Sequence, residues 1–409
     1  MARVRTDLYR RVLSAPGARS LYGFSLLARI PVTAASTALT LRVVLGLHRD
    51  FTDAGLVATS AALGVALGAP LLGHLVDRRG ARTVLVLTTL SEGAFWAAAA
   101  WLPFSWLLPA AFLGGALALP AFSLARQAIV ALLPAADRQA GLSLDSMSVE
   151  VSYAIGPALG VLAVTQLGSR TAMLAIGASL VLAGMGLIAL DPATASSATL
   201  GDTTEVSVSP RLGRWWLAPT VLGALVATCG ATLTLTGTEI ALTASMRAFA
   251  HIGLLGVVVA AWCLASIVGG FAYGMMSRRR DPLVLLGLLA GLTLLLALAD
   301  AWWVLLLLVI PSGLFCAPLL SSTAEVMARV SPPGRRGRAL GLHTSALTFG
   351  GALGAPLAGA AIDRWSPASG FVTVGVVGSL LAAIALALVQ VRKGSSDSPT
   401  LPGEARLKA

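Results

Sequence analysis

Eight ionisable side chains lie inside stretches of the sequence that are otherwise apolar, and their chemistry is the first clue to function. They are Arg29, Glu92, Arg126, Asp145, Glu150, Glu239, Glu325 and His343. A charged side chain in an apolar environment is costly, so it usually faces a partner or a water-filled space. A carboxylate removed from water binds and releases a proton nearer to neutral pH, which suits a residue that carries a coupling proton.

Four of these side chains lie deep enough in their apolar runs to be candidates for binding a proton or the substrate. They are Arg29, Glu92, Glu150 and Glu239. Glu150 and Glu239 are the candidates for the coupling proton. The alternative for each residue is a buried ion pair that only fixes the packing of helices.

The remaining charged residues lie nearer to the ends of their runs. Arg126, Asp145 and Glu325 suit a gate at the cytoplasmic face, with Arg126 paired either to Asp145 or to Asp77. His343 lies in the first turns of an apolar run, and we interpret it as a packing or hydrogen-bonding residue rather than a ligand.

The sequence shows no other kind of active site. Cys229, Cys263 and Cys316 are far apart and the four histidines are scattered, so no metal site is predicted. Neither Gly-x-Ser-x-Gly nor the phosphate-binding Gly-x-x-x-x-Gly-Lys-Ser/Thr occurs, which argues against a hydrolase and against ATP as the energy source. We predict a protein that is not an enzyme and has no cofactor. A membrane sensor or enzyme is the least favoured alternative.

The composition favours lipid as the surrounding solvent. Of 409 residues, 56% are hydrophobic and 11% are charged, whereas a soluble domain carries roughly 25% charged residues. The net charge of +11 would suggest nucleic acid for a soluble protein, but the arginines fall in short loops between apolar runs. We therefore predict an all-α, multi-pass membrane protein, monomeric and without a nucleic-acid partner, in which the lipid bilayer is the main contact.

Twelve apolar segments are long enough to cross a bilayer, which requires about 20 residues. They cover residues 21–47, 53–76, 82–101, 106–130, 140–165, 171–190, 216–243, 252–276, 282–299, 302–328, 339–363 and 370–391. Twelve spans with the N-terminus inside place most arginines on one side. The outer loops would hold only Arg49, Arg170, Arg247 and Arg364. This asymmetry predicts that both termini are cytoplasmic, in the cytoplasmic (inner) membrane of a bacterium.

The chain divides near its middle into two similar halves. We predict a six-helix bundle over 1–190, a cytoplasmic linker over 191–214, a second six-helix bundle over 215–392 and a cytoplasmic tail over 393–409. Residues 120–160 and 318–359 share an apolar helix, a basic loop with proline, and a second helix with Pro-x-x-Gly near its outer end. Duplicated halves are typical of secondary transporters, with the substrate site at the midplane between them.

The loop after the second span carries the most specific motif. It reads Gly73-His74-Leu75-Val76-Asp77-Arg78-Arg79-Gly80-Ala81-Arg82. A glycine at position 73 allows close helix contact, a glycine at position 80 permits a tight turn, and Asp77 can accept hydrogen bonds from a neighbouring helix terminus. These residues could form a latch that holds one conformation. The loop closely resembles the signature of the major facilitator superfamily, with Gly73, Leu75, Asp77, Arg78, Gly80 and Arg82 as the matching positions.

The resemblance implies two pseudo-symmetric six-helix bundles that alternate access to a central site. In the fifth span, Gly156-Pro157-Ala158-Leu159-Gly160 is similar in part to the antiporter motif of exporting members. The related residues of the second half are Gly354, Pro356 and Gly359. The alternative for these six positions is a helix kink that serves packing. We therefore expect a proton-coupled exporter of a small organic solute. The alternative is proton-coupled uptake of a metabolite.

Overall fold

The computed structural model describes residues 6–49, 51–190, 215–276, 279–332 and 335–396. This part of the chain is helical throughout, as the all-α prediction requires. The predicted linker, 191–214, lies outside the described residues. So does most of the predicted tail, because the last helix continues to Ser396 and the description ends there.

The first half consists of a short helix followed by six membrane-length segments. The short helix is α1 (Thr6–Ser14). The segments are α2 (Ala18–Leu41) with its continuation η1 (Arg42–Gly46), α3 (Phe51–Arg79), α4 (Ala81–Ala99), α5 (Phe104–Ala116) with α6 (Ala121–Leu132), α7 (Arg138–Leu167) and α8 (Ser169–Leu190).

The second half repeats this order. Its segments are α10 (Pro219–Ala248), α11 (Leu255–Met275), α12 (Pro282–Leu295) with η4 (Leu296–Leu298), α13 (Trp302–Gly313) with α14 (Cys316–Val330), α15 (Arg336–Arg364) and α16 (Pro367–Ser396). Ten of the segments in the described chain are long and apolar enough to cross a membrane by themselves. Adding α4 and the shorter α12–η4 segment gives the twelve that were predicted.

The predicted fourth and tenth spans are each broken in the middle. The first break separates α5 from α6, where Pro120 precedes α6. The second separates α13 from α14, shortly after Pro311 within α13. Proline cannot donate a backbone hydrogen bond and crowds the preceding turn, so both breaks occur where the sequence weakens the helix.

Equivalent glycines join equivalent helices in the two halves. A Cβ atom on Gly156 of α7 would collide with Thr33 of α2, and one on Gly354 of α15 would collide with Thr236 and with the backbone of Leu233 in α10. Close approach of two helices needs small residues at the crossing point. The repeat seen in the sequence is therefore present in the packing.

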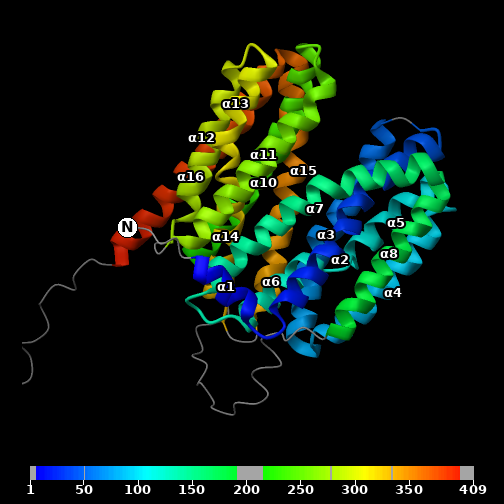
Figure 1. Cartoon of the computed structure of the whole chain (residues 1–409), viewed down its shortest axis with the longest axis horizontal. Coiled ribbons are helices and arrows are strands. Elements are labelled where there is room, and N and C mark those ends of the chain that lie inside the picture. The colour runs from blue at the N-terminus through cyan, green and yellow to red at the C-terminus, as the bar shows by residue number, and fades with distance from the viewer. Residues whose placement is uncertain (1–5, 50, 191–214, 277–278, 333–334, 397–409) are drawn as a thin grey trace, which may run out of the picture.

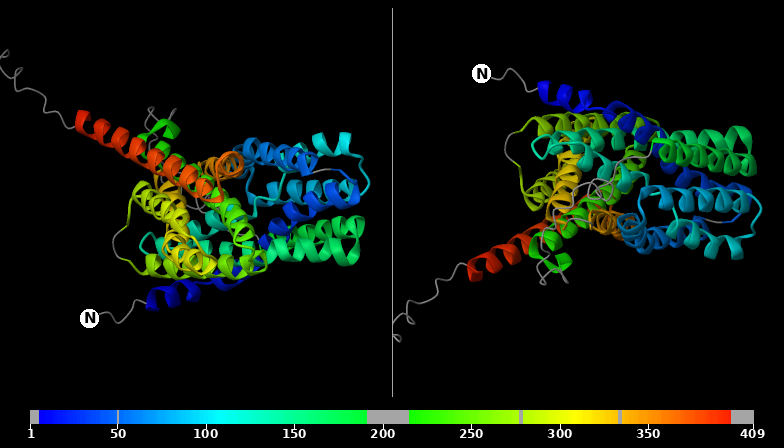
Figure 2. Two further views of the ribbon diagram at one scale, coloured as in Figure 1. Left: turned by 90° about the horizontal axis from the view of Figure 1, so that it is seen from above. Right: turned by 90° about the horizontal axis from the view of Figure 1, so that it is seen from below.

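The two halves touch at one end and diverge toward the other (Figure 1). We call the touching end the linker side, because α8 ends there and α10 begins there, and the opposite end the far side. α1, α6 and α14 lie at the linker side, whereas the far ends of α7 and α13 point apart (Figure 1). Views from above and below show the two halves side by side (Figure 2), and they meet mainly where α15 packs on α3 and α11 packs on α7.

Candidate functional site: the contact between the two halves

The strongest contact at the linker side joins the end of α3 to the beginning of α15. The Asp77 carboxylate accepts hydrogen bonds from the backbone N–H groups of Gly337, at 2.7 Å, and of Arg338, at 2.9 Å. Free N–H groups and the positive end of the dipole make a helix N-terminus a good partner for a carboxylate. Asp77 therefore holds the second half against the first in this conformation.

Two glycines bring the backbones of α3 and α15 together beside this carboxylate. A Cβ atom on Gly73 would collide with the carbonyl of Gly337, and one on Gly337 would collide with the carbonyl of Gly73 and with Asp77. One turn further along α15, the backbone of Gly341 packs on Ala69. The Ser345 hydroxyl then donates to the Ala66 carbonyl at 2.6 Å.

The other motif residues support this arrangement from the first half. Gly80 has a φ of +81°, which lets the chain turn directly from α3 into α4. Leu75 packs in the apolar cluster beneath the turn. Arg78 and Arg82 are exposed.

In the symmetry-related contact between α7 and α11, the helix end again accepts and the helix start again donates, but the side chain and the backbone exchange roles. The second half lacks an aspartate equivalent to Asp77. Instead, the Gln139 amide in the first turn of α7 donates to the carbonyls of Tyr273, at 2.6 Å, and Met276, at 3.3 Å, at the end of α11. Sequence analysis missed Gln139 because a single buried amide has no distinguishing pattern.

An ion pair lies next to this second contact. Arg279 pairs with Glu325 of α14 at 2.6 Å and donates to the Ala135 carbonyl of the first half at 3.3 Å. Glu325, predicted for a gate, therefore lies at the linker side beside the junction of the halves.

The N-terminal helix α1 docks on the second half. Its Tyr9 ring stacks on Phe271 of α11 with centroids 4.8 Å apart, and the hydroxyl donates to the Phe271 carbonyl at 2.8 Å. Burial raises the pKa of Tyr9, so the hydroxyl remains a donor at neutral pH.

A buried polar network crosses between the halves above these contacts. The Asp145 carboxylate accepts from Arg29 at 2.6 Å and from Arg126 at 3.2 Å. Arg29 also donates to Ser148 at 2.8 Å, and its guanidinium lies over the Phe122 ring. Arg126 thus pairs with Asp145, one of its two predicted partners, and Arg29 joins the same network. Arg29 and Asp145 are completely buried.

The network reaches the second half through His343. Arg126 Nη1 lies 3.2 Å from His343 Nδ1, and His343 Nε2 lies 2.9 Å from Thr323 Oγ1. His343 is completely buried. As predicted, it makes hydrogen bonds, and these bonds join α6 of the first half to α14 and α15 of the second.

Glu150 makes a separate connection between the halves, nearer to the midplane. Its Oε1 atom accepts from the Ser266 hydroxyl at 2.9 Å and from the Cys316 thiol at 3.2 Å. The same hydroxyl accepts from the backbone N–H of Ala317 at the start of α14. Within the described chain Glu150 has no ion-pair partner, so its polar contacts all come from neutral groups of the second half.

The other two acidic candidates occupy different surroundings. Glu239 of α10 is exposed and lies within electrostatic reach of Tyr153, which is 59% exposed. Glu92 is buried inside the first half, where it accepts from Trp96 at 2.7 Å and from the Leu119 N–H at the break between α5 and α6 at 3.0 Å. Glu239 therefore faces the region between the halves, whereas Glu92 supports a helix break.

Three glycines of the proposed kink motif lie at close contacts between helices. Gly160 packs against the Ala34 carbonyl, as Gly156 does against Thr33, while Gly359 has open space around it. Pro157 and Pro356 lie inside unbroken helices, α7 and α15. Three of these six positions, Gly156, Gly160 and Gly354, thus lie where α7 crosses α2 or α15 crosses α10.

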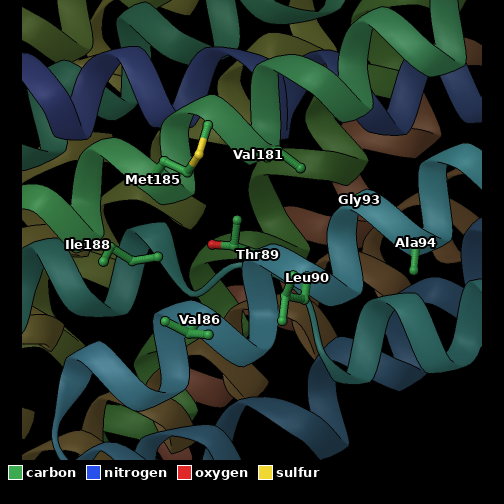
Figure 3. A pocket seen from close by; sticks show the side chains of 8 residues that line it. All are labelled: Val86, Thr89, Leu90, Gly93, Ala94, Val181, Met185 and Ile188. Atoms are coloured by element: carbon green, nitrogen blue, oxygen red, sulfur yellow. The ribbon is translucent and has the colours of Figure 1, made fainter.

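A groove of about 450 Å³ lies away from this contact, on the outer surface of the first half (Figure 3). It runs between α4 and α8 and is lined by apolar side chains and Thr89. No group of three metal-binding side chains occurs in the described ranges.

The chain belongs to the Major Facilitator Superfamily, whose family model matches residues 21–246 and 220–408. Secondary transport across a membrane is thus its general activity, and the twelve-helix architecture predicted from the sequence is confirmed. Among curated proteins, no significant match to this chain exists.

Several solved structures share the fold. The human organic anion transporter MFSD10 (TETRAN) has a TM-score of 0.65 and 18% identity, over 93% of this chain and 99% of that chain. A bacterial homologue of the iron transporter ferroportin, in an outward-facing state, has a TM-score of 0.67 and 14% identity, over 91% and 98%. The proton:xylose symporter XylE, bound to 6-bromo-6-deoxy-D-glucose, has a TM-score of 0.67 and 15% identity, over 93% and 96%.

Proposed function

We propose that this protein exports a small organic solute across the cytoplasmic membrane in exchange for protons. The observation that carries the proposal is the position of Glu150. Its carboxyl group belongs to the first half, whereas the groups that donate to it, Ser266 and Cys316, belong to the second half. Any rocking of one half against the other must change the partners of this carboxyl group.

An acid whose partners depend on conformation can couple a proton to transport. A carboxylate needs hydrogen-bond donors or water, whereas a protonated carboxyl group needs fewer, so the two forms favour different surroundings. Proton binding to Glu150 therefore biases the equilibrium between conformations. Exposed Glu239 is the second candidate for the proton, because it faces the region between the halves.

The distribution of arginines supports a cytoplasmic location for the linker side. At that side the described residues include Arg78, Arg79, Arg82, Arg138, Arg279, Arg280, Arg335, Arg336 and Arg338. The far side has Arg49, Arg170, Arg247 and Arg364. Cationic residues accumulate on the cytoplasmic side of membrane proteins. The conformation described here is then closed to the cytoplasm.

Export is favoured over uptake by the fifth span. Its Gly156-Pro157-x-x-Gly160 pattern resembles part of the antiporter motif, and these glycines set the close contact of α7 with α2. A monomer is sufficient for this mechanism, because both halves of the transport path lie in one chain.

Transport in inside-out vesicles tests the proposal. With an acidic lumen, wild-type protein should accumulate a substrate found by screening lipophilic and polar organic solutes, and collapse of the pH gradient should abolish the accumulation. Glu150→Gln and Glu239→Gln should be compared with Glu92→Gln, which alters an acid inside the first half only. Full pH coupling in both Glu150→Gln and Glu239→Gln would contradict the assignment of the proton.

A further inference from the structure

The hydrogen bonds of His343 fix which of its nitrogens carries the proton. Arginine has only donors, so Arg126 must donate to His343 Nδ1 across their 3.2 Å contact. The ring is therefore neutral with its proton on Nε2, which donates to Thr323 Oγ1 at 2.9 Å. The Thr323 hydroxyl in turn donates to the Leu320 carbonyl at 3.0 Å. Both ring nitrogens of His343 and the hydroxyl proton of Thr323 are therefore occupied by hydrogen bonds.

A second proton on the ring is incompatible with this arrangement. It would occupy Nδ1, so that two donors and two positive charges would face each other between Arg126 and His343. Completely buried, His343 has no water to relieve that repulsion. Separation of α6 from α15 removes the conflict, because Nδ1 is then free to bind a proton from water.

Among the charged and titratable groups on the helices that pack around His343, Arg126 is the one in contact with the imidazole. Asp145 is bonded to Nε of Arg126 and to Arg29, whereas His343 contacts Nη1 of Arg126. From α14, the near residue is Thr323, while Glu325 turns to Arg279. From α3, Asp77 and His74 lie at the first turn of α15, well before position 343. Glu239 of α10 interacts with Tyr153 and Cys263 instead, and α16 carries no charged residue between Pro367 and Leu388.

We propose that His343 is a proton-binding site that opens the contact between the two halves at the linker side when it is occupied. The neutral imidazole stabilises the closed linker side by joining Arg126 to Thr323. The imidazolium ion destabilises it and favours the conformation in which the halves have separated at that end. This inference rests on the proposed alternation between conformations but is independent of the identity of the solute and of the role of Glu150.

The effect of pH on the equilibrium between the closed and open conformations has a definite upper limit. A single site that binds a proton only in the open conformation changes the ratio of open to closed molecules by up to about tenfold per pH unit. The change occurs near the pH range in which histidine ordinarily titrates, roughly pH 5.5 to 7.5. Because the completely buried imidazole meets water only after the halves separate at the linker side, acid on that side would hold the transporter in the linker-side-open form.

The test measures a distance rather than transport. Cysteines introduced by Ala136→Cys in the first half and Arg280→Cys in the second, both at exposed positions of the linker side, carry spin labels in a background with Cys229, Cys263 and Cys316 replaced by serine. The distribution of label distances is recorded in lipid nanodiscs over the same pH range. Wild-type histidine should give a long-distance population that grows as the pH falls.

Three variants decide the outcome. His343→Gln can keep both hydrogen bonds without gaining charge, so the pH response should fall by the full histidine contribution, up to about tenfold per pH unit. Arg126→Gln removes the repelling charge and should also flatten the response. His251→Gln, at an exposed far-side histidine, should leave it unchanged. A pH response in His343→Gln equal to that of wild type would overturn the proposal.

Transport measurements separate this inference from the proposed function. If the distances respond to pH through His343 while no pH-driven flux of any solute is found, export in exchange for protons fails and the proton site stands. If pH-driven flux is present but His343→Gln retains the wild-type distance response, the proton site fails and the proposed function stands.

Discussion

Asp77 and Gly337 are 260 positions apart in the chain, yet the Asp77 carboxylate accepts the Gly337 N–H at 2.7 Å. This bond joins the last turn of α3 to the first turn of α15, so a residue of the signature loop in one half caps a helix of the other. Since the same carboxylate also accepts from Arg338, it satisfies two N–H groups that a helix N-terminus would otherwise leave to water.

Replacement Asp77→Asn should release the closed linker side. Asparagine has one carbonyl oxygen and no charge, so it retains at most one of the two hydrogen bonds and loses the attraction of the helix dipole. A hydrogen bond to a charged group contributes about 1.5–3 kcal/mol, which corresponds to a shift of roughly tenfold or more toward the open conformation. The label pair at positions 136 and 280 measures this shift.

A matched control is available in the second half. Asp281 accepts from the Leu283 N–H at the start of α12, within one half. Asp281→Asn should lower thermal stability slightly and leave the label distances unchanged. Equal distance shifts in the two variants would show that capping in general, and not the contact between halves, controls the conformation.

The glycine contact should be equally sensitive to a single methyl group. Gly337→Ala places a Cβ atom against the Gly73 carbonyl and the Asp77 carboxylate, so the halves must move apart at the linker side. Gly359→Ala, in the same helix but with open space around it, should be neutral or slightly stabilising, because alanine favours helix by about 1 kcal/mol over glycine. Reactivity of a linker-side cysteine with a membrane-impermeant thiol reagent compares the two.

The buried pair of Asp145 with two arginines predicts a large loss of stability. Asp145→Asn would leave Arg29 and Arg126 without a counter-ion in a completely buried site, and breaking a buried pair from one side costs about 3–5 kcal/mol. The exposed pair of Arg11 with Asp137 provides the contrast, since Arg11→Gln should cost less than about 1 kcal/mol. Thermal unfolding in detergent measures both. A similar unfolding midpoint for the two variants would contradict the prediction.

Tyr9→Phe should weaken the docking of α1, and the size of this effect should not change with pH near neutrality. The variant keeps the stacking on Phe271 but loses one neutral hydrogen bond, worth about 1 kcal/mol. Because burial raises the pKa of Tyr9, the bonding hydroxyl stays protonated below the ordinary tyrosine pKa, and its contribution is lost only under more alkaline conditions. Limited proteolysis of α1 between about pH 6 and 8 should therefore show one constant difference from wild type.

The sequence was sufficient to predict the twelve segments, the two halves and the loop that contains Asp77. Apolar run length and arginine placement determine the segments, and both depend on local composition. It could not predict which way each polar side chain faces, because depth in an apolar run does not define direction around the helix. Arg29 and Glu150 were both expected to lie deep in their apolar runs, yet Arg29 lies against Asp145 whereas Glu150 lies against Ser266 and Cys316.

Polar residues whose role depends on contacts with other helices were the hardest to recognise from the sequence. Gln139, Ser266 and Thr323 are ordinary polar residues in apolar surroundings, where hydroxyl groups often only bond to their own helix. Gln139 and Ser266 make hydrogen bonds to groups more than 50 positions away in the chain. Thr323 bonds to His343 on the neighbouring helix. Such pairings depend on how the two halves approach each other.

The docking of α1 on α11 also constrains how the protein is made. Helix α1 leaves the ribosome well before α11, but the carbonyl that accepts the Tyr9 hydroxyl belongs to Phe271, which is synthesised 262 positions after Tyr9. Until then the apolar face of α1 has no partner in the second half and must rest on the membrane surface or on the first helices. Fastening of the N-terminus is thus a late step of biogenesis, and a bulky fusion placed directly before α1 would interfere with assembly more than one placed after α16.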